Sequence, residues 1–371
     1  MYSIIYTAGM VLVWLINLFN GTGLGAVYKT TELAMMIAMV IAIACVAFKM
    51  AKDGDILVQP RFFYTIVPLT LVFGGISILK GYGITGFESL WPFLIVYILS
   101  LTRPNITALR MTAIAYGAMG MIVLYVFNYM DTLKGWNPNT IAMIGLFSFL
   151  VFTIPFYGMS GWRSFVLLPL VGTAYVILLW PTESRSCIIA IIATLAVVLR
   201  MIPVRGIFRT STGMWVLMFV PLIIAIFISL FSIFGDISGL TQWSYETFNK
   251  PLFNGRDQIW INGFLQVFQR PLFGSGNNNA GYWHNSAVAC LVAYGVVGYY
   301  FWVRILYQIL KEGVPYMDDV AVIGSMAAFG IIYCHQSVEL GFFAVNPSLL
   351  PYVILGILLG RVNYVKERSL R

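Results

Sequence analysis

The sequence predicts an all-α polytopic membrane protein, a single bundle of about 12 transmembrane helices spanning residues 1–371. Apolar residues make up 60% of the 371 residues, and charged residues only 10%. A soluble domain carries about 25% charged residues, so a water-soluble globular protein is excluded. The apolar residues also gather in repeated runs that approach the roughly 20 residues needed to cross a bilayer as a helix.

Twelve apolar runs, separated by short polar breaks, define the predicted spans. The fourth run is short, and the last is interrupted by Pro347 and Pro351. In chain order the runs cover residues 2–20, 31–49, 62–79, 89–102, 106–129, 140–159, 164–181, 186–203, 213–235, 286–309, 319–337 and 343–360.

The distribution of Lys and Arg predicts the orientation of the bundle. The two termini and the breaks on their side of the membrane hold 15 of the 22 basic residues, and the other side holds seven. Positive residues stay cytoplasmic because moving them across the membrane costs free energy. We therefore expect both termini to be cytoplasmic. The net charge of +8 is then a topology signal, and no nucleic-acid partner is expected.

One connection, residues 236–285, is polar and about fifty residues long, and it falls on the predicted outer side between the ninth and tenth spans. Ordering a long loop costs conformational entropy, so loops of this length are usually functional. Within it, the apolar residues of Ile259–Phe268 follow helical spacing and predict an amphipathic helix at the membrane interface.

Ionisable groups gather at this outer level. Glu183 and Arg185 lie where the seventh and eighth spans meet, His284 begins the tenth span, and His335 ends the eleventh, with Glu339 beyond it. Ionisable residues at a membrane boundary are candidates for function, although long side chains near helix ends also extend towards water for structural reasons.

The order of several short motifs resembles the O-antigen ligase and polymerase superfamily. Glu183-Ser184-Arg185-Ser186 opens an apolar helix, and Gly255-Arg256-Asp257-Gln258-Ile259-Trp260 follows in the long loop. Next come Pro271-Leu272-Phe273-Gly274-Ser275-Gly276, His284-Asn285 and Gly295-Val296-Val297-Gly298. Each motif is weak by itself. Their order over residues 183–298 is similar to the family pattern, whereas the preceding spans match only in being hydrophobic.

This resemblance implies a GT-C-like membrane glycosyltransferase in the bacterial cytoplasmic membrane. Members take a glycan from an undecaprenyl-diphosphate carrier at the outer face and transfer it to a sugar hydroxyl. The implied partners are this lipid-linked donor, a glycan acceptor that is either lipid-linked or lipid A–core, and membrane lipid. A chain-length regulator is an additional candidate partner. The family is thought to work without a metal, so no metal and no cofactor is expected.

The motif positions predict the roles of individual residues. Arg185 and Arg256 are the first candidates to bind the diphosphate, because a guanidinium stays protonated and binds phosphate oxygens bidentately. Arg270 and Lys250 are weaker candidates. Histidine is a common general base in enzymes, and His284 is the candidate base for the attacking hydroxyl. Asn285 is expected to orient the glycan or to cap the tenth span, and Trp260 and His335 are candidate substrate contacts.

Structural explanations remain open for the same residues. Arg185 fits an interfacial anchor, and Arg256 in a polar loop fits a solvated side chain. His284 and His335 fit ordinary helix-boundary histidines, and Trp260 fits the aromatic belt of a membrane protein.

Two other functions compete with a polysaccharide polymerase. An O-antigen ligase would use the same residues with lipid A–core as the acceptor. A transporter or flippase for lipid-linked sugars suits twelve spans, but transporters usually place charges near the midplane and contain two related halves. Here the span interiors carry few charges and the polar groups crowd one face, which favours the enzyme.

Overall fold

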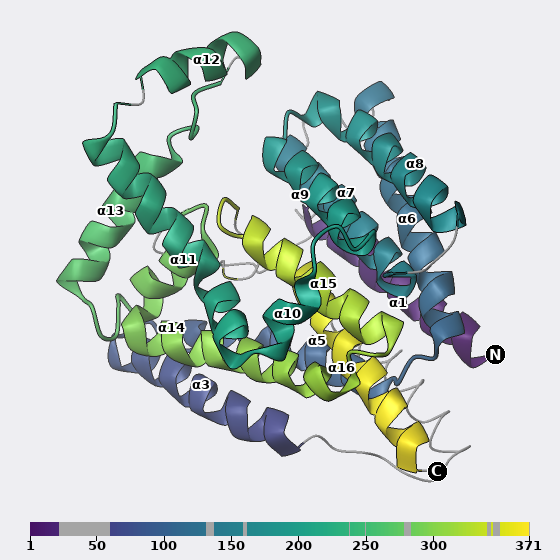
Figure 1. The fold of residues 1–371 in the computed structure, drawn as a ribbon. Helices are drawn as coiled ribbons and strands as arrows, with labels where there is room; N and C mark the ends of the chain where they lie inside the picture. Colours follow the sequence, from purple (N-terminus) through teal and green to yellow (C-terminus); the bar gives the residue numbers. More distant parts are fainter. Residues whose placement is uncertain are drawn as a thin grey trace.

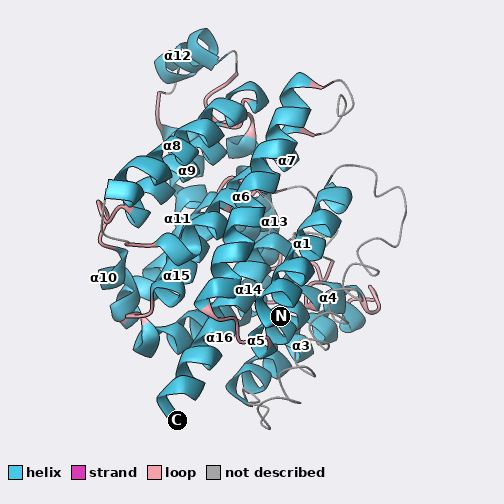
Figure 2. Cartoon of the chain, turned by 90° about the vertical axis from the view of Figure 1, so that its right-hand side faces the viewer, coloured by secondary structure: helices cyan, strands magenta, loops and turns pink. Residues whose placement is uncertain are grey.

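The computed structural model describes residues 1–21, 60–130, 137–158, 162–236, 238–248, 250–277, 283–339, 343 and 349–370. Within these ranges the chain is helical and contains no strand (Figures 1 and 2). The prediction of an all-α protein is confirmed for this part of the chain.

The described residues form α-helices, and three 3-10 turns (η3, η4 and η5) extend or precede them. Their bounds are α1 Tyr2–Gly21, α3 Pro60–Leu79, α4 Thr85–Glu88, α5 Trp91–Leu101, α6 Ile106–Tyr129, α7 Pro138–Thr153, η3 Ile154–Phe156, α8 Trp162–Leu179, η4 Trp180–Thr182, α9 Arg185–Val198, α10 Val204–Arg209, α11 Ser211–Phe234, α12 Ser238–Phe248, α13 Arg256–Gln269, α14 Ser286–Gly313, η5 Val314–Tyr316, α15 Val320–His335 and α16 Leu349–Leu370.

Five described helical segments are long and apolar enough to cross a membrane, which identifies a membrane protein by length and composition. They are residues 106–129, 138–156, 165–182, 211–234 and 286–316. The predicted run 31–49 lies outside the described residues, and helices lie within the other predicted runs. Several of these helices, such as α9 and α15, are shorter than a full span. The count of twelve crossings therefore stays a prediction.

Helix α15 lies at the centre of the bundle. Each residue from 321 to 330 is buried, and the helix packs against α7, α9, α11, α14 and α16. Gly324 allows the closest approach, since a Cβ at this position would overlap the carbonyl group of Ile154. A helix that is apolar on all sides must be surrounded by protein or lipid. Helix α15 is surrounded mostly by other helices of the protein.

The predicted long loop, residues 236–285, is helical over about half its length. The predicted amphipathic helix lies inside α13, which packs against α11 and α14 (Figure 1). Trp260 and Gly263 are buried on the packed side of α13, and Phe268 is exposed. The apolar side of this helix therefore meets protein. Helix α12 extends away from the bundle (Figure 1).

Helix α14 is broken in its middle. Gly295 has φ 64° and ψ −168°, a conformation available to glycine only. The break removes two hydrogen bonds that a continuous helix would form, from Val296 N–H to the Val292 carbonyl and from Val297 N–H to the Ala293 carbonyl. Buried peptide groups need partners, and inside a membrane protein water does not supply them.

The segment Pro271–Gly276 satisfies all four of these peptide groups. Val296 N–H donates to the Pro271 carbonyl at 2.9 Å, and Val297 N–H donates to the Leu272 carbonyl at 3.2 Å. In return, Ser275 N–H donates to the Val292 carbonyl at 2.9 Å, and Gly276 N–H to the Ala293 carbonyl at 2.7 Å. The motifs around residues 271–276 and 295–298 are thus two halves of one backbone interlock.

The far end of α15, where Asp319 caps its first turn, carries a separate network of charged residues. Arg361 pairs with Asp319 through Nε–Oδ1 at 3.0 Å and Nη2–Oδ2 at 2.7 Å, and it also donates to the Pro104 carbonyl. Beside it, Arg103 pairs with Glu367 at 3.1 Å. These bonds join the start of α15 to α16 and to the turn between α5 and α6.

We predict that Gly295→Ala will destabilise the protein by about 3 kcal/mol, because a methyl group at this backbone conformation is strained. An added Cβ would also overlap the backbone of Leu272 and so push apart the interlock. Thermal unfolding of the purified protein in detergent measures the loss. Gly75→Ala in α3 is the matched control, because a Cβ there meets nothing within 4 Å. Equal midpoints for the two variants would contradict the interlock.

Candidate functional site

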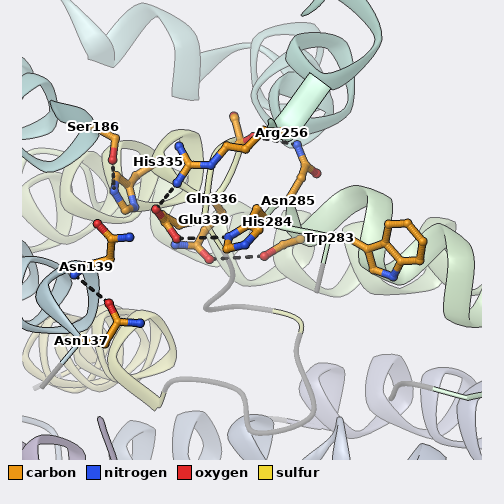
Figure 3. A network of polar contacts seen from close by, with 12 residues as sticks. Asn137, Asn139, Ser186, Arg256, Trp283, His284, Asn285, His335, Gln336 and Glu339 are labelled. Atoms are coloured by element: carbon orange, nitrogen blue, oxygen red, sulfur yellow. Dashed lines mark hydrogen bonds and ion pairs between the residues drawn. The ribbon is translucent and has the colours of Figure 1, made fainter. Parts of the chain in front are cut away.

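The starts of α9, α13 and α14 and the end of α15 meet at one end of the bundle, here called the site end. Figure 3 shows Arg256 at the start of α13, His284 just before α14, and Glu339 just after α15 pointing towards one another. The 16 residues of α15 rise about 24 Å, which separates the site end from the Arg361–Asp319 network.

Glu339 is the centre of the polar cluster at the site end. Its Oε1 accepts a hydrogen bond from Arg256 Nη2, and its Oε2 lies 3.8 Å from His284 Nδ1. Glu339 and Arg256 are largely buried, with side-chain exposures of 14% and 18%, whereas His284 is 37% exposed. One carboxylate thus holds a cation on one side and faces a partly accessible imidazole on the other.

The charge of Glu339 is maintained by these neighbours. Burial raises the pKa of the Glu339 carboxyl, but the His284 side chain and the Arg256 guanidinium lower it by more in sum. The net result is a pKa below the ordinary value of 4.5, so Glu339 is ionised at neutral pH.

Helix α15 brings His335 to the first turn of α9. His335 Nε2 lies 3.2 Å from Ser186 Oγ and 3.4 Å from Cys187 Sγ. The imidazole is 5% exposed, and its Nδ1 has no hydrogen-bond partner among the described residues. His335 also interacts electrostatically with the charges of Glu339 and Arg256.

Arg185 connects α9 to α12 and to the segment between α12 and α13. Its Nη1 donates to Ser244 Oγ at 3.1 Å, and its Nη2 donates to the Pro251 carbonyl at 3.3 Å. Lys250, beside Pro251, forms an ion pair with Glu183. The guanidinium groups of Arg185 and Arg256 interact electrostatically. Two arginines and one lysine therefore lie within the same neighbourhood.

The helix starts add positive potential to this neighbourhood. The first turns of α9 and α13 have no side-chain cap, so their N–H groups are not bound by a capping side chain. The N-terminus of a helix carries about +0.5 elementary charge and favours anions. The site end therefore combines fixed backbone dipoles with side-chain cations, which is an arrangement suited to an anionic ligand.

The residues just before α9, α13 and α14 include three with a strained backbone. Glu183, Asn254 and His284 have φ values of 55°, 54° and 47° and precede α9, α13 and α14. A left-handed conformation of this kind costs a non-glycine residue about 1–2 kcal/mol. The surrounding packing holds these residues in place, and such strain is concentrated at functional sites in proteins.

The structure brings five of the sequence-predicted site residues to the site end: Arg185, Arg256, His284, His335 and Lys250. Arg270 lies elsewhere. It follows the last turn of α13, and the 14 residues of that helix rise about 21 Å from Arg256. Its side chain is exposed.

Asn285 and Trp260 lie inside the protein. Asn285 Oδ1 accepts from the N–H groups of Ala287 and Val288, and its Nδ2 donates to the Pro221 and Ser337 carbonyls. Of the two predicted roles, the structure therefore shows the cap, and the amide has used its hydrogen-bonding capacity. Trp260 is 1% exposed and donates to the Trp283 carbonyl at 2.6 Å, so neither face of its ring is open to stack on a sugar.

Glu339 is the residue of this cluster to which sequence analysis assigned no role. The only available signal was its position four residues after His335 at the end of an apolar run. That spacing does not reveal that Arg256, 83 positions earlier, is its partner. Among the described residues, no group of three or more His, Cys, Asp or Glu side chains is placed to hold a metal ion.

Fold and site together define a helical membrane protein with a cluster of cations and imidazoles at one end of its bundle. Comparison with family models, with curated proteins and with solved structures found no match to this chain.

We predict that Glu339→Gln will lower the free energy of unfolding at pH 7 by about 2 kcal/mol, because Arg256 loses its charged partner while remaining largely buried. The folded-state pKa of Glu339 is below its ordinary value, so its contribution is complete above that ordinary value. It is lost as the pH falls through the folded-state pKa. The stability gap to the variant should therefore shrink in acid.

Chemical denaturation of both proteins between neutral and acidic pH measures this gap. Glu246→Gln is the matched control, because Glu246 is exposed on α12 and accepts a hydrogen bond from its helix neighbour Gln242. We expect a change within about 0.5 kcal/mol for this control. A gap between wild type and Glu339→Gln that stays constant in acid would rule out the ionised pair.

Proposed function

We propose that the protein is a membrane glycosyltransferase that polymerises undecaprenyl-diphosphate-linked oligosaccharide repeats. The observation that carries the proposal is the position of Arg185, Arg256 and His284 at one end of an apolar bundle, where the Glu339 carboxylate pairs with Arg256 and faces His284. These three residues were the first candidates from the motif order, and they come from three different helices.

The arginines would act on the leaving group. Transfer breaks the bond between the anomeric carbon of the donor sugar and a diphosphate oxygen, and the electron pair leaves with the diphosphate. Stabilising that developing charge is usually the largest catalytic term. Arg185 now donates to two neutral oxygens, of Ser244 and Pro251. A diphosphate oxygen is a stronger acceptor than either, because charge-assisted bonds are about twice as strong as neutral ones.

His284 would act on the acceptor. As the acceptor hydroxyl oxygen bonds to the anomeric carbon, its proton passes to the His284 imidazole. The charge of the Glu339 carboxylate, 3.8 Å from Nδ1, stabilises the imidazolium that forms. The partial exposure of His284 leaves one side of the imidazole accessible to an acceptor, while Glu339 stays buried.

The predicted orientation places this chemistry at the outer face of the bacterial cytoplasmic membrane, with both termini inside. Contacts of the two termini support it. Ser3 Oγ donates to Asn105 Oδ1, and Glu367 pairs with Arg103, so both ends of the chain contact the turn before α6. The same region holds Arg361. A basic end opposite the site end agrees with the rule that positive residues stay cytoplasmic.

We predict that Arg185→Ala, Arg256→Lys and His284→Ala will each lower the rate of glycan transfer by about 10²–10³-fold. Lysine keeps the charge of Arg256 and the partner of Glu339 but loses the planar fork. The measurement is polymer formation by purified protein in lipid vesicles supplied with lipid-linked repeats. Arg304→Ala is the control, because Arg304 is exposed on α14 beyond the break at Gly295.

The same assay tests the two competing functions. Chain growth from lipid-linked repeats alone supports a polymerase, and transfer that requires lipid A–core supports a ligase. Undiminished polymer in all three variants would end the assignment of these residues. Movement of lipid-linked repeats across the vesicle membrane without bond formation would favour a transporter.

A further inference from the structure

An apolar cavity of about 410 Å³ runs between α9, α10, α11 and α15. The proposed catalytic residues Arg185, Arg256 and His284 do not line it. Small residues, including Ala193 and Gly330, leave the space open. A Cβ on Gly330 would meet Phe208 at 3.5 Å and Leu217 at 3.7 Å, which are ordinary contacts across the cavity.

The two ends of this cavity differ in chemistry. One end is lined by Ser186 and His335, and the other by Val204 and Phe208 of α10. Ser186 follows Arg185 in the chain, and His335 feels the charges of Arg256 and Glu339. The polar end of the cavity therefore adjoins the cation cluster, and the rest of its length is apolar.

A buried group with unused hydrogen-bonding capacity lies at the polar end. His335 is 5% exposed, and its Nδ1 has no partner among the described residues. A buried polar atom without a partner costs free energy.

The cavity is accessible from the apolar surface of the bundle. Among its lining residues, Ile189 of α9 is 66% exposed and Ile207 of α10 is 41% exposed. On a helical membrane protein, exposed apolar side chains of the membrane-spanning bundle face lipid. A hydrocarbon chain can therefore enter sideways from the bilayer without crossing water.

We infer that this cavity binds the polyprenyl chain of the lipid-linked donor, next to its diphosphate, an inference that rests on the proposed function. The cavity between these four helices accommodates one hydrocarbon chain. A polyprenyl diphosphate has one such chain, whereas a phospholipid has two. The neighbouring Arg185 and Arg256 match a diphosphate better than the single phosphate of a phospholipid. The volume accommodates only the part of the chain nearest the headgroup, and the remainder lies in the bilayer.

The first test measures binding of sugar-free polyprenyl diphosphate to the full-length protein in nanodiscs. Ala193→Trp fills the cavity, and Ile177→Trp is the control, because Ile177 is 60% exposed on α8 and lies outside the cavity. We expect Ala193→Trp to weaken binding about tenfold, since losing about two buried methylene groups has this effect. Binding of inorganic pyrophosphate, which lacks a chain, should not change. Equal polyprenyl affinity in both Trp variants would overturn the inference.

The second test locates the chain directly. A photoreactive benzoylphenylalanine in place of Ile207 should crosslink to the polyprenyl diphosphate, and the same group in place of Ile177 should not. Crosslinking of Ile207 to phosphatidylglycerol that excess polyprenyl diphosphate does not displace would assign the cavity to phospholipid and overturn the inference. Neither test measures transfer. An inactive wild type that still crosslinks through Ile207 would contradict the proposed glycosyltransferase but retain the cavity assignment.

Discussion

The fold depends on how it satisfies the peptide groups that are released where α14 breaks at Gly295. Leaving four buried peptide groups unpaired would cost several kcal/mol in an apolar bundle. The Pro271–Gly276 segment pairs with all four, and Ser77 Oγ of α3 then donates to the Gly276 carbonyl at 2.8 Å. The interlock ties the chain that follows α13 to the middle of α14. It therefore restricts where Arg256 and His284, at the other ends of these helices, come to lie.

A second constraint is the number of charges buried at the site end. Arg256 and Glu339 are both largely inside the protein, and removing two ions from water costs several kcal/mol per ion unless they pair. Their ion pair offsets this cost and keeps the guanidinium in place. The same pairing leaves part of the Arg256 fork available, since one Nη2 bond to Glu339 uses one of its five donors.

Sequence analysis indicated most residues of the candidate site, because the residues at a membrane boundary can be identified from where each apolar run ends. The ends of apolar runs share a level, and Arg185, His284 and His335 lie at such ends. Sequence analysis grouped Arg270 with the candidates that bind the diphosphate. Helix α13 separates Arg270 from Arg256 by about 21 Å. Asn285 and Trp260 satisfy internal backbone groups, and a single sequence does not distinguish a buried polar group from an exposed one. Glu339 required knowledge of which helices are neighbours.

The sequence by itself determined the class of protein and the positions of most of its apolar helices among the described residues, because hydrophobic length is a local property of the chain that must match the thickness of the bilayer. Only the tertiary structure decided which helix ends meet, that two weak glycine motifs form one backbone interlock, and that Glu339 joins Arg256 to His284. Those relations depend on contacts between residues tens to hundreds of positions apart. Packing and the pairing of buried polar groups select such contacts, and no local pattern in the chain encodes them.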